Sequence, residues 1–261
     1  MTIHPLSQVH PDAKIASNVE IGPFVFVDKN VEIGAGTVIA PNVTILEGSR
    51  IGENCRIFSG AVIGGIPQDL KFKGEETLAI VGNNTTIREC VTVNRGTVAK
   101  GKTIVGDNCL LMAYSHVAHD CVVGNNVIVA NASQLAGEVE VDDFAILGGG
   151  TLVHQFCKIG AHVMIQGGTK VAKDIPPFCT AAREPISFVG VNSIGLKRRG
   201  YSIEQITQIQ DIYRIIFQSK LNTSNAIANV IETIPESDER KLIVDFIKGS
   251  DRGIIKGFVK E

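Results

Sequence analysis

Large aliphatic residues recur at every sixth position of this chain, from Ile3 to Val171. Of the 29 positions in that series, 26 are Ile, Leu or Val, and the exceptions are Asp69, Glu75 and Ala99. An α-helix and an alternating strand have shorter periods, so neither element produces this pattern. Short strands that turn a corner every six residues do produce it, and hexapeptide repeats are typical of a parallel β-helix. The sequence therefore predicts a mainly β protein with a parallel β-helix over residues 1–176.

The positions between the large aliphatics predict how each coil is built. A small or β-branched residue usually follows the aliphatic by four positions, as at Val43 and Ala61, and we expect it to pack beneath the corner. Three hexads make one triangular coil, so residues 18 apart should stack. At roughly 4.8 Å between strands, about nine coils give a prism about 45 Å long. Glycine often follows the aliphatic directly, as at Gly34 and Gly160, and we expect it to supply the positive φ of the corner.

Two segments interrupt the repeat. Residues 66–78 keep the count of six but lose the apolar signal, which predicts a loop pushed out of the prism. A smaller break surrounds residues 99–102. Long loops on a regular scaffold are often functional. Pro176 and Pro177 are expected to end the strand ladder, leaving residues 177–200 as a connection to a C-terminal helical domain over 201–261.

The period becomes helical after Gly200. Ser202 and Gln205 form a capping-box pattern at the start of the first predicted helix. A second helix is predicted after Thr223 and a third from about Ser237. The residues expected on their inward faces are Ile203, Ile206, Ile209, Ile212, Ile216, Ile227, Val230, Ile231, Ile234, Leu242, Ile243, Phe246 and Ile247. These helices would cover the open end of the prism or pack against its side.

Composition narrows the class of protein. The net charge of −2 argues against a nucleic-acid partner. No apolar stretch approaches membrane-spanning length and no signal segment is present, so we expect a cytoplasmic protein without a membrane span. Cys55, Cys109, Cys121 and Cys157 occupy the small inward position of their hexads and are predicted to be free buried thiols. No Cys-x-x-Cys spacing indicates zinc.

Three histidines in the second half of the repeat, His116, His119 and His154, are candidates for chemistry. The stacking of residues 18 apart places His119, Gly137 and Gln155 in one column on the outside of the prism. The column offers an imidazole, an accessible backbone N–H and an amide. A base beside a backbone donor is the minimum equipment for acyl transfer. A lone exposed histidine is usually an ordinary solvated residue, but this convergence favours a site.

At these residues the chain resembles a known family, the acyl-carrier-protein:UDP-N-acetylglucosamine O-acyltransferases of lipid A synthesis. The hexapeptide repeat alone identifies only a superfamily, whereas several motifs in order are specific to this family. The resemblance covers nearly the whole chain. The motifs are Gln68-Asp69-Leu70-Lys71, His116-Val117-Ala118-His119-Asp120, Leu135-Ala136-Gly137, Val153-His154-Gln155-Phe156-Cys157, and Gly190-Val191-Asn192 with Gly195-Leu196-Lys197-Arg198-Arg199-Gly200.

The resemblance implies a homotrimer of left-handed β-helices with active sites between neighbouring subunits. The reaction it implies moves a 3-hydroxyacyl chain from acyl carrier protein to the 3-hydroxyl of UDP-N-acetylglucosamine, the first step of lipid A biosynthesis. No metal or soluble cofactor is implied. The carrier is acidic, so it should approach a basic rim, for which the candidates are Lys73, Arg88, Lys100, Lys102, Lys170, Lys173 and Arg183.

The resemblance also implies individual roles. His119 would be the general base, Asp120 would orient it, and the N–H of Gly137 would stabilise the oxyanion. Asp69 and Lys71 would contact the sugar and the reacting region, with Gln68 alongside. The residues implied to hold the nucleotide and phosphates are His116, Gln155, Asn192, Arg198 and Arg199. His154 would meet the hydroxyl of the acyl chain, and Gly167 lies where family members gauge acyl length.

Three positions depart from the family pattern and leave alternatives open. Asn94 replaces a frequent histidine near the sugar, Glu138 replaces a histidine after the oxyanion glycine, and Ile194 replaces an acidic residue. A 3-amino analogue of the sugar is therefore an alternative acceptor.

Three other classes of protein are also weighed. A glucosamine N-acyltransferase of the same pathway normally has an extra N-terminal domain, for which a repeat beginning at Ile3 leaves no room. The others are a zinc enzyme like the γ-carbonic anhydrases, with His116, His119 and His154 as ligands, and a purely structural β-helix.

Overall fold

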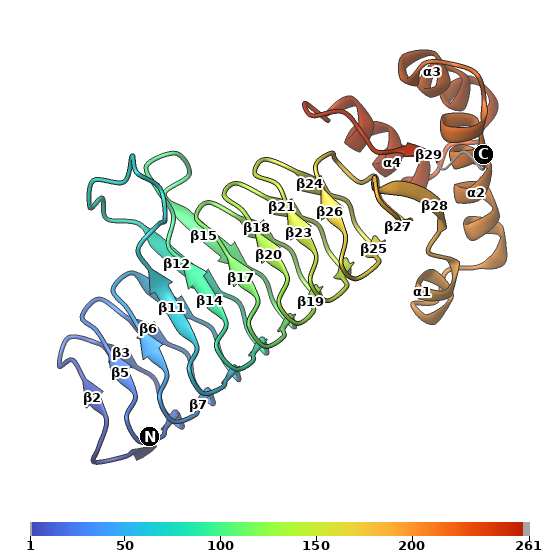
Figure 1. The fold of residues 1–261 in the computed structure, drawn as a ribbon. Helices are drawn as coiled ribbons and strands as arrows, with labels where there is room; N and C mark the ends of the chain where they lie inside the picture. The colour runs from blue at the N-terminus through green and yellow to red at the C-terminus, as the bar shows by residue number, and fades with distance from the viewer. Residues whose placement is uncertain (1, 258–261) are drawn as a thin grey trace.

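In the computed structural model, which describes residues 2–257, the chain winds into a triangular prism of short parallel strands capped by helices at its C-terminal end (Figure 1). Successive strands go to three sheets in turn, here called faces A, B and C. The predicted parallel β-helix is confirmed. The edges between faces, called the AB, BC and CA corners, are the turns between successive strands.

The strands of each face are short, and most have two residues. Face A contains β1 (Thr2–Ile3), β4 (Glu20–Ile21), β7 (Val38–Ile39), β10 (Arg56–Ile57), β13 (Thr86–Ile87), β16 (Leu110–Leu111), β19 (Ile128–Val129), β22 (Ile146–Leu147), β25 (Met164–Ile165), β27 (Cys179–Ala182), β28 (Ser187–Val191) and β29 (Lys256–Gly257). Face B contains β2 (Gln8–Val9), β5 (Phe26–Val27), β8 (Thr44–Ile45), β11 (Val62–Gly65), β14 (Thr92–Asn94), β17 (His116–Val117), β20 (Gln134–Leu135), β23 (Leu152–Val153) and β26 (Lys170–Val171). Face C contains β3 (Lys14–Ile15), β6 (Glu32–Ile33), β9 (Ser49–Ile51), β12 (Leu78–Val81), β15 (Lys102–Val105), β18 (Val122–Val123), β21 (Glu140–Val141) and β24 (Lys158–Ile159).

The interior is filled as the repeat predicts. Large aliphatics such as Ile57 and Leu135 are buried, and the small corner residues Val43 and Ala61 are completely buried. Cys55, Cys109, Cys121 and Cys157 are free and buried, which confirms that prediction. Burial raises the pKa of the Cys121 thiol to about 12, so this thiol stays protonated and acts as a small apolar side chain.

The expected role of the corner glycines is wrong. Gly34 and Gly160 do not carry the positive φ, which falls two positions later, as at Asn54 (φ 54°) and Asn126 (φ 57°). Glycine is needed directly after the aliphatic because successive coils approach closely there. A β-carbon on Gly34 would lie 2.5 Å from the carbonyl carbon of Gly52 in the next coil.

Both interruptions of the repeat leave the prism at the BC corner. Residues 66–77 lie between β11 and β12, and residues 95–101 lie between β14 and β15. The two excursions are joined at their bases, since Thr77 donates to the carbonyl of Gly96 at 2.6 Å. Where a coil includes an excursion, the residues paired between neighbouring coils are more than 18 apart in sequence, as with Val93 and Val117. Val117 and Leu135 pair at the regular separation of 18 residues.

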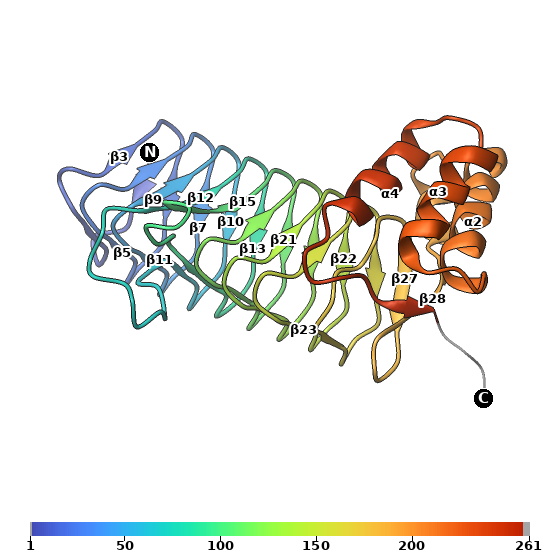
Figure 2. The ribbon, with the colours of Figure 1, turned by 90° about the horizontal axis from the view of Figure 1, so that it is seen from above.

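The strand ladder continues past the two prolines, contrary to expectation. β27 pairs in parallel with β25, and β28 returns antiparallel to it. Four helices follow at this end: α1 (Ser193–Arg198), α2 (Ile203–Gln218), α3 (Thr223–Thr233) and α4 (Asp238–Lys248). Figure 2 shows α2 and α3 beyond the last coils, with α4 running back toward the prism, where the carbonyl of Gly249 at its end accepts from Lys158 of β24 at 3.0 Å. Tyr213 of α2 is bonded to the carbonyl of Pro177 and its ring packs on Phe188 and Phe217.

The helical predictions hold with local exceptions. The capping box of Ser202 and Gln205 is formed. Ile203, Ile231 and Leu242 were expected to face inward but are exposed, Ile203 because it is the first residue of α2. The six residues of α1 are too few to show a helical period, so this helix was not predicted. Among residues 2–257, no helix has the length and apolar character needed to span a bilayer.

Candidate active site at the BC corner

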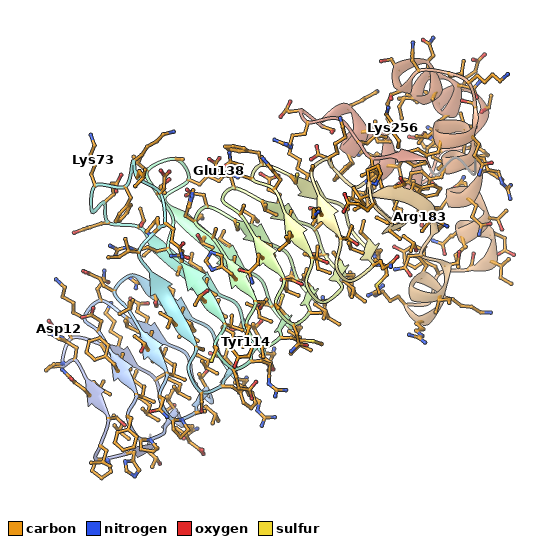
Figure 3. The ribbon with its side chains drawn as sticks, in the orientation of Figure 1. Asp12, Lys73, Tyr114, Glu138, Arg183 and Lys256 are labelled. Carbon is orange, nitrogen blue, oxygen red and sulfur yellow. The ribbon has the colours of Figure 1, made fainter. Side chains whose placement is uncertain are left out.

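The column predicted from the 18-residue spacing lies at the BC corner, on the edge that also bears both excursions. Glu138 donates its backbone N–H to the carbonyl of His119, and Phe156 donates to that of Gly137, so the three coils stack in register. Figure 3 shows Glu138 on the same edge of the prism as Lys73 of the first excursion, with Tyr114 on another edge. The corner thus gathers residues from five separate turns of the chain, namely the two excursions and the three turns of the column.

The imidazole of His119 lies directly against Gly137. A β-carbon at position 137 would be 2.6 Å from Nε2 and 2.5 Å from Cε1 of the histidine. Any side chain at 137 would therefore displace the ring. Glycine at this position lets the imidazole and the backbone of the next coil share one small space.

Asp120 holds the other ring nitrogen of His119. Its Oδ2 lies 2.9 Å from Nδ1 and also accepts the Thr97 hydroxyl at 2.6 Å. Its Oδ1 accepts the backbone N–H of Thr97 at 2.9 Å and of Lys100 at 3.3 Å. The carboxylate is completely buried. Burial alone would raise the pKa of Asp120, but the bonds from Thr97 and His119 outweigh it and hold that pKa below its ordinary value.

The ionised carboxylate determines the histidine tautomer. Because it can only accept, Nδ1 of His119 carries the proton and Nε2 keeps its lone pair. Nε2 is the nitrogen that lies against Gly137, so the free lone pair is directed toward the neighbouring coil.

The backbone N–H of Gly137 is available to a ligand because of where it lies in the corner. At the corners from His4 to Gly167 outside the two excursions, the first residue donates to the next coil, while the second donates to no backbone carbonyl within residues 2–257. Pro5, Pro11, Pro23 and Pro41 occupy this second position in the first coils, as expected where no N–H is used. Gly137 is the equivalent residue of its coil, but the residue itself is buried against the ring of His119 and lines the pocket described below, so its N–H is less accessible than the sequence predicted.

A shallow pocket of about 380 Å³ surrounds these groups. Five of the predicted site residues line it, namely Gln68, His116, His119, Gly137 and Gln155. His116 is held by Thr92, whose hydroxyl lies 2.7 Å from Nδ1, and burial lowers the pKa of His116. This imidazole is therefore neutral near pH 7 and can donate one hydrogen bond and accept another.

Other predicted residues lie near the column without lining the pocket. Asp69 forms the turn of the first excursion, where its Oδ1 accepts the backbone N–H of Lys71 at 2.9 Å. Lys71 is exposed, and Leu70 between them is completely exposed. His154 is exposed beside Gln155. These groups can reach a ligand only if it extends along the corner or if another chain completes the site.

The remaining predicted residues lie on other corners and are not brought to His119 within one chain. Asn192 and Arg199 contact the CA corner, where Asn192 donates to the carbonyl of His162 at 2.9 Å and Arg199 to that of Phe144 at 3.2 Å. Arg198 is exposed. Gly167 lies on the AB corner, where a β-carbon would lie 2.9 Å from the carbonyl oxygen of Gly149.

Sequence reasoning missed Thr97 and His162. The side chain of Asn94, the first departure from the family pattern, is buried, and its Nδ2 donates to the carbonyl of Ile66 at the base of the first excursion. Of the other two departures, Glu138 lies in a half-exposed turn with a φ of 61°, and Ile194 is exposed on α1. No signal in the six-residue period marks Thr97, because it belongs to an excursion.

Within the described part of the chain, residues 2–257, no three His, Cys, Asp or Glu side chains are grouped so that they could hold a metal ion. His116 and His119 share the pocket, whereas His154 directs its Nδ1 toward the carbonyl of Gln155.

Comparison with known proteins identifies the class first. The family described as bacterial transferase hexapeptide (six repeats) matches residues 102–137, and the domain 2 family of Udp N-acetylglucosamine O-acyltransferase matches residues 174–255. The fold is therefore the left-handed parallel β-helix of hexapeptide-repeat transferases.

Relatives over the full length then identify the particular family. An acyl-[acyl-carrier-protein]--UDP-N-acetylglucosamine O-acyltransferase from Thiobacillus denitrificans is 49% identical over 98% of this chain and 99% of its own. One from Pseudomonas syringae pv. syringae is 47% identical over 97% and 99%. This chain belongs to the acyl-[acyl-carrier-protein]--UDP-N-acetylglucosamine O-acyltransferase family.

Solved structures agree with this assignment. The UDP-N-acetylglucosamine acyltransferase of Bacteroides fragilis is 57% identical, with a TM-score of 0.97 over 98% of this chain and all of that one. The enzyme of Arabidopsis is 32% identical, with a TM-score of 0.85 over 97% of this chain and all of that one. The likeness includes the helical cap as well as the prism.

Proposed function

We propose that this protein transfers a 3-hydroxyacyl chain from acyl carrier protein to the 3-hydroxyl of UDP-N-acetylglucosamine, the first step of lipid A biosynthesis. The observation that carries the proposal is the arrangement of His119, with Nδ1 held by Asp120 and Nε2 against Gly137. Family membership supplies the substrates, since the relatives are named for this donor and this acceptor.

The chemistry follows from the free lone pair of Nε2. His119 accepts the proton of the sugar 3-hydroxyl as the oxygen attacks the thioester carbonyl carbon. The carbonyl oxygen becomes an oxyanion, which the N–H of Gly137 stabilises. Collapse of the tetrahedral intermediate breaks the C–S bond, and the proton on Nε2 passes to the departing thiolate. Asp120 stabilises the transient imidazolium throughout, because its ionised carboxylate contacts Nδ1.

The other predicted residues serve to hold the substrates. We assign the sugar and the reacting region to Gln68, Asp69 and Lys71, and the acyl hydroxyl to His154. Gly167 leaves room for the end of the acyl chain. The nucleotide and its phosphates are assigned to His116, Gln155, Asn192, Arg198 and Arg199. Arginine suits the diphosphate because its planar guanidinium makes paired hydrogen bonds to phosphate oxygens.

We infer a homotrimer with sites between subunits because the assigned residues lie on different corners of one prism. His119 is at the BC corner, whereas Arg199 contacts Phe144 at the CA corner. One small substrate cannot contact both corners of the same chain, but it can do so when the corner of one copy packs beside that of another. A mass of three chains by light scattering supports this inference, and a monomer contradicts it.

Docking of the acidic carrier is assigned to the basic residues nearest the pocket. Lys73 and Lys100 lie on the two excursions at the BC corner, and Lys102 begins β15 directly after the second excursion. Lys100 forms an ion pair with Glu140 at 3.0 Å. Glu140 is three residues after Gly137, so the Lys100 side chain lies beside the coil of Gly137. A carrier affinity that does not change with salt concentration argues against this docking surface. The free cysteines, exposed Cys90 included, agree with a reducing compartment, so we place the enzyme in the cytoplasm.

The test of the function is direct. The purified protein is incubated with UDP-N-acetylglucosamine and a pool of 3-hydroxyacyl carrier proteins of mixed chain length, and the nucleotide products are weighed by mass spectrometry. We expect one acyl unit to be added, and its mass gives the preferred length. His119→Ala should abolish the product while the oligomer stays intact.

Other outcomes point to the alternatives. Product only with the 3-amino sugar shows that the acceptor is the amine and that the transferase chemistry is otherwise unchanged. One bound zinc per subunit with no product revives the zinc-enzyme class. Full activity of His119→Ala contradicts its role as the base.

A further inference from the structure

We propose that His162 is a positioning residue for the acceptor nucleotide, fixing Asn192 through its carbonyl and Arg199 through its ring. The inference rests on the proposed function, which assigns Asn192 and Arg199 to the nucleotide. His162 itself contacts neither the pocket at the BC corner nor the base.

The backbone of His162 fixes the first of these residues. His162 is the third residue of its CA corner, with a φ of 60°, and is 8% exposed. Its carbonyl accepts the Nδ2–H of Asn192 at 2.9 Å. The Oδ1 of Asn192 accepts the N–H of Gly195 at 3.2 Å and so caps α1. The carbonyl of one corner therefore sets the position of Asn192 and the start of the helix that precedes Arg199.

The ring of His162 supports the second residue through a stack. It lies parallel to Phe144 at 4.8 Å between centroids and to Phe178 at 5.5 Å on its other side. The guanidinium of Arg199 covers Phe144 at 5.3 Å and donates to its carbonyl. The order along the corner is thus Arg199, Phe144, His162 and Phe178. Removing the ring at 162 would leave Phe144 without its neighbour and free the surface on which Arg199 rests.

Histidine adds a polar contact that phenylalanine lacks. The hydroxyl of Tyr201 lies 3.2 Å from Nε2, and its ring meets the imidazole edge-on. Tyr201 is two residues after Arg199, so this bond ties the end of α1 to the prism. Burial, together with Arg199, lowers the pKa of His162 to about 4. The ring is therefore neutral and does not repel the neighbouring guanidinium.

Two buried atoms of this cluster have no partner among residues 2–257, namely Nδ1 of His162 and Nη1 of Arg199. An unpaired buried polar atom is costly. Nη1 of Arg199 is a donor that no residue of the described chain uses, so holding the guanidinium in this place carries a cost.

The chain itself offers matched variants for a test. Asparagine occupies the same corner position at Asn108 and Asn126, and phenylalanine at Phe144 and Phe178, all with positive φ. His162→Asn keeps the turn but removes the stack, and His162→Phe keeps the turn and the stack but removes the bond to Tyr201. Both variants are therefore compatible with the coil.

The experiment compares the Michaelis constants for the two substrates and the affinity for UDP by calorimetry. A misplaced charge-assisted contact weakens binding by about tenfold. We expect His162→Asn to raise the KM for UDP-N-acetylglucosamine and the Kd for UDP by about tenfold, while the KM for the acyl carrier stays unchanged. His162→Phe should show a much smaller rise, because the stack is kept.

Two results overturn the inference. Unchanged UDP affinity in a folded His162→Asn protein shows that the stack does not position Arg199. A fall in kcat of the same size in both variants, with both Michaelis constants unchanged, shows that His162 has only a structural role. Failure of the proposed function is distinguishable, since the wild-type protein would then neither bind UDP nor use UDP-N-acetylglucosamine.

Discussion

Nε2 of His119 lies where a β-carbon of Gly137 would be only 2.6 Å away. This relationship joins two coils of the prism, because residues 18 apart stack. It brings a nitrogen lone pair and the backbone N–H of Gly137 into one pocket, while Asp120, held by Thr97 of the second excursion, fixes the ring. Groups on a rigid scaffold need little reorganisation during the reaction. Preorganised donors stabilise the transition state for that reason.

Gly137→Ala should therefore abolish most of the activity while leaving the fold intact. The added methyl group displaces the imidazole and covers the N–H, and loss of an oxyanion donor alone costs about 100-fold or more in kcat. The variant is assayed for turnover and thermal unfolding. Gly249→Ala at the end of α4 is the control, since the φ of −88° suits alanine and the added β-carbon needs only a small shift from the carbonyl oxygen of Asp245 at 3.3 Å. Normal turnover of Gly137→Ala contradicts the arrangement.

Asp120→Asn should lower kcat much more than Thr97→Val. An amide that turns its NH₂ toward His119 favours the tautomer with the proton on Nε2, which removes the base, so we expect a loss of about 100-fold or more. Thr97→Val removes one hydroxyl bond to Asp120 but keeps the backbone N–H bond, and we expect about tenfold or less. Both kcat values are measured beside the unfolding midpoints. Equal losses in the two variants would assign Asp120 a structural role alone.

The fold could be predicted from the sequence because its repeat is local. Each large aliphatic, such as Ile57 or Leu135, points inward because it occupies the same position of its hexad. The stacking of coils follows from three hexads per coil. The period does not reveal where coils touch. It therefore gave the wrong reason for the corner glycines. Glycine is needed at position 34 because the backbone of Gly52 in the next coil lies too close for a β-carbon. The period also missed α1, which is shorter than two helical turns.

The repeat predicts the site only where the site follows the period, whereas Gln68 and His116, which also line the pocket, were predicted from the family motifs. His119, Gly137 and Gln155 fall in line by the spacing of 18, and the 66–78 loop appears as a gap in the period. The bonds of Thr97 to Asp120 and of Asn94 to Ile66 depend on how two irregular excursions fold against each other. No periodic signal describes such contacts. The CA corner was missed because His162 occupies a turn position usually taken by asparagine.

Asn94→Ala should loosen the first excursion without unfolding the prism. The change leaves the carbonyl of Ile66 without its donor, at a local cost of about 1–3 kcal/mol. We expect faster tryptic cleavage after Lys71 and Lys73, a higher KM for the nucleotide sugar and little change in the unfolding midpoint. Asn131→Ala, at an exposed AB corner, is the control for cleavage. An unchanged cleavage rate shows that Asn94 does not anchor the excursion.

His162→Phe should make the protein less sensitive to acid. The pKa of His162 is lowered to about 4 in the folded chain by burial and by Arg199, against about 6.5 when unfolded. Between these values the unfolded chain binds more protons, so stability falls as the pH falls from 6.5 toward 4. For one such group the loss between pH 7 and pH 4.5 is about 2 kcal/mol. The measurement is denaturant unfolding at both pH values for wild type and variant. Phenylalanine does not titrate, so the variant should lose less stability by about that amount. Identical losses would show that His162 is already protonated or that it stays accessible to protons in the folded state.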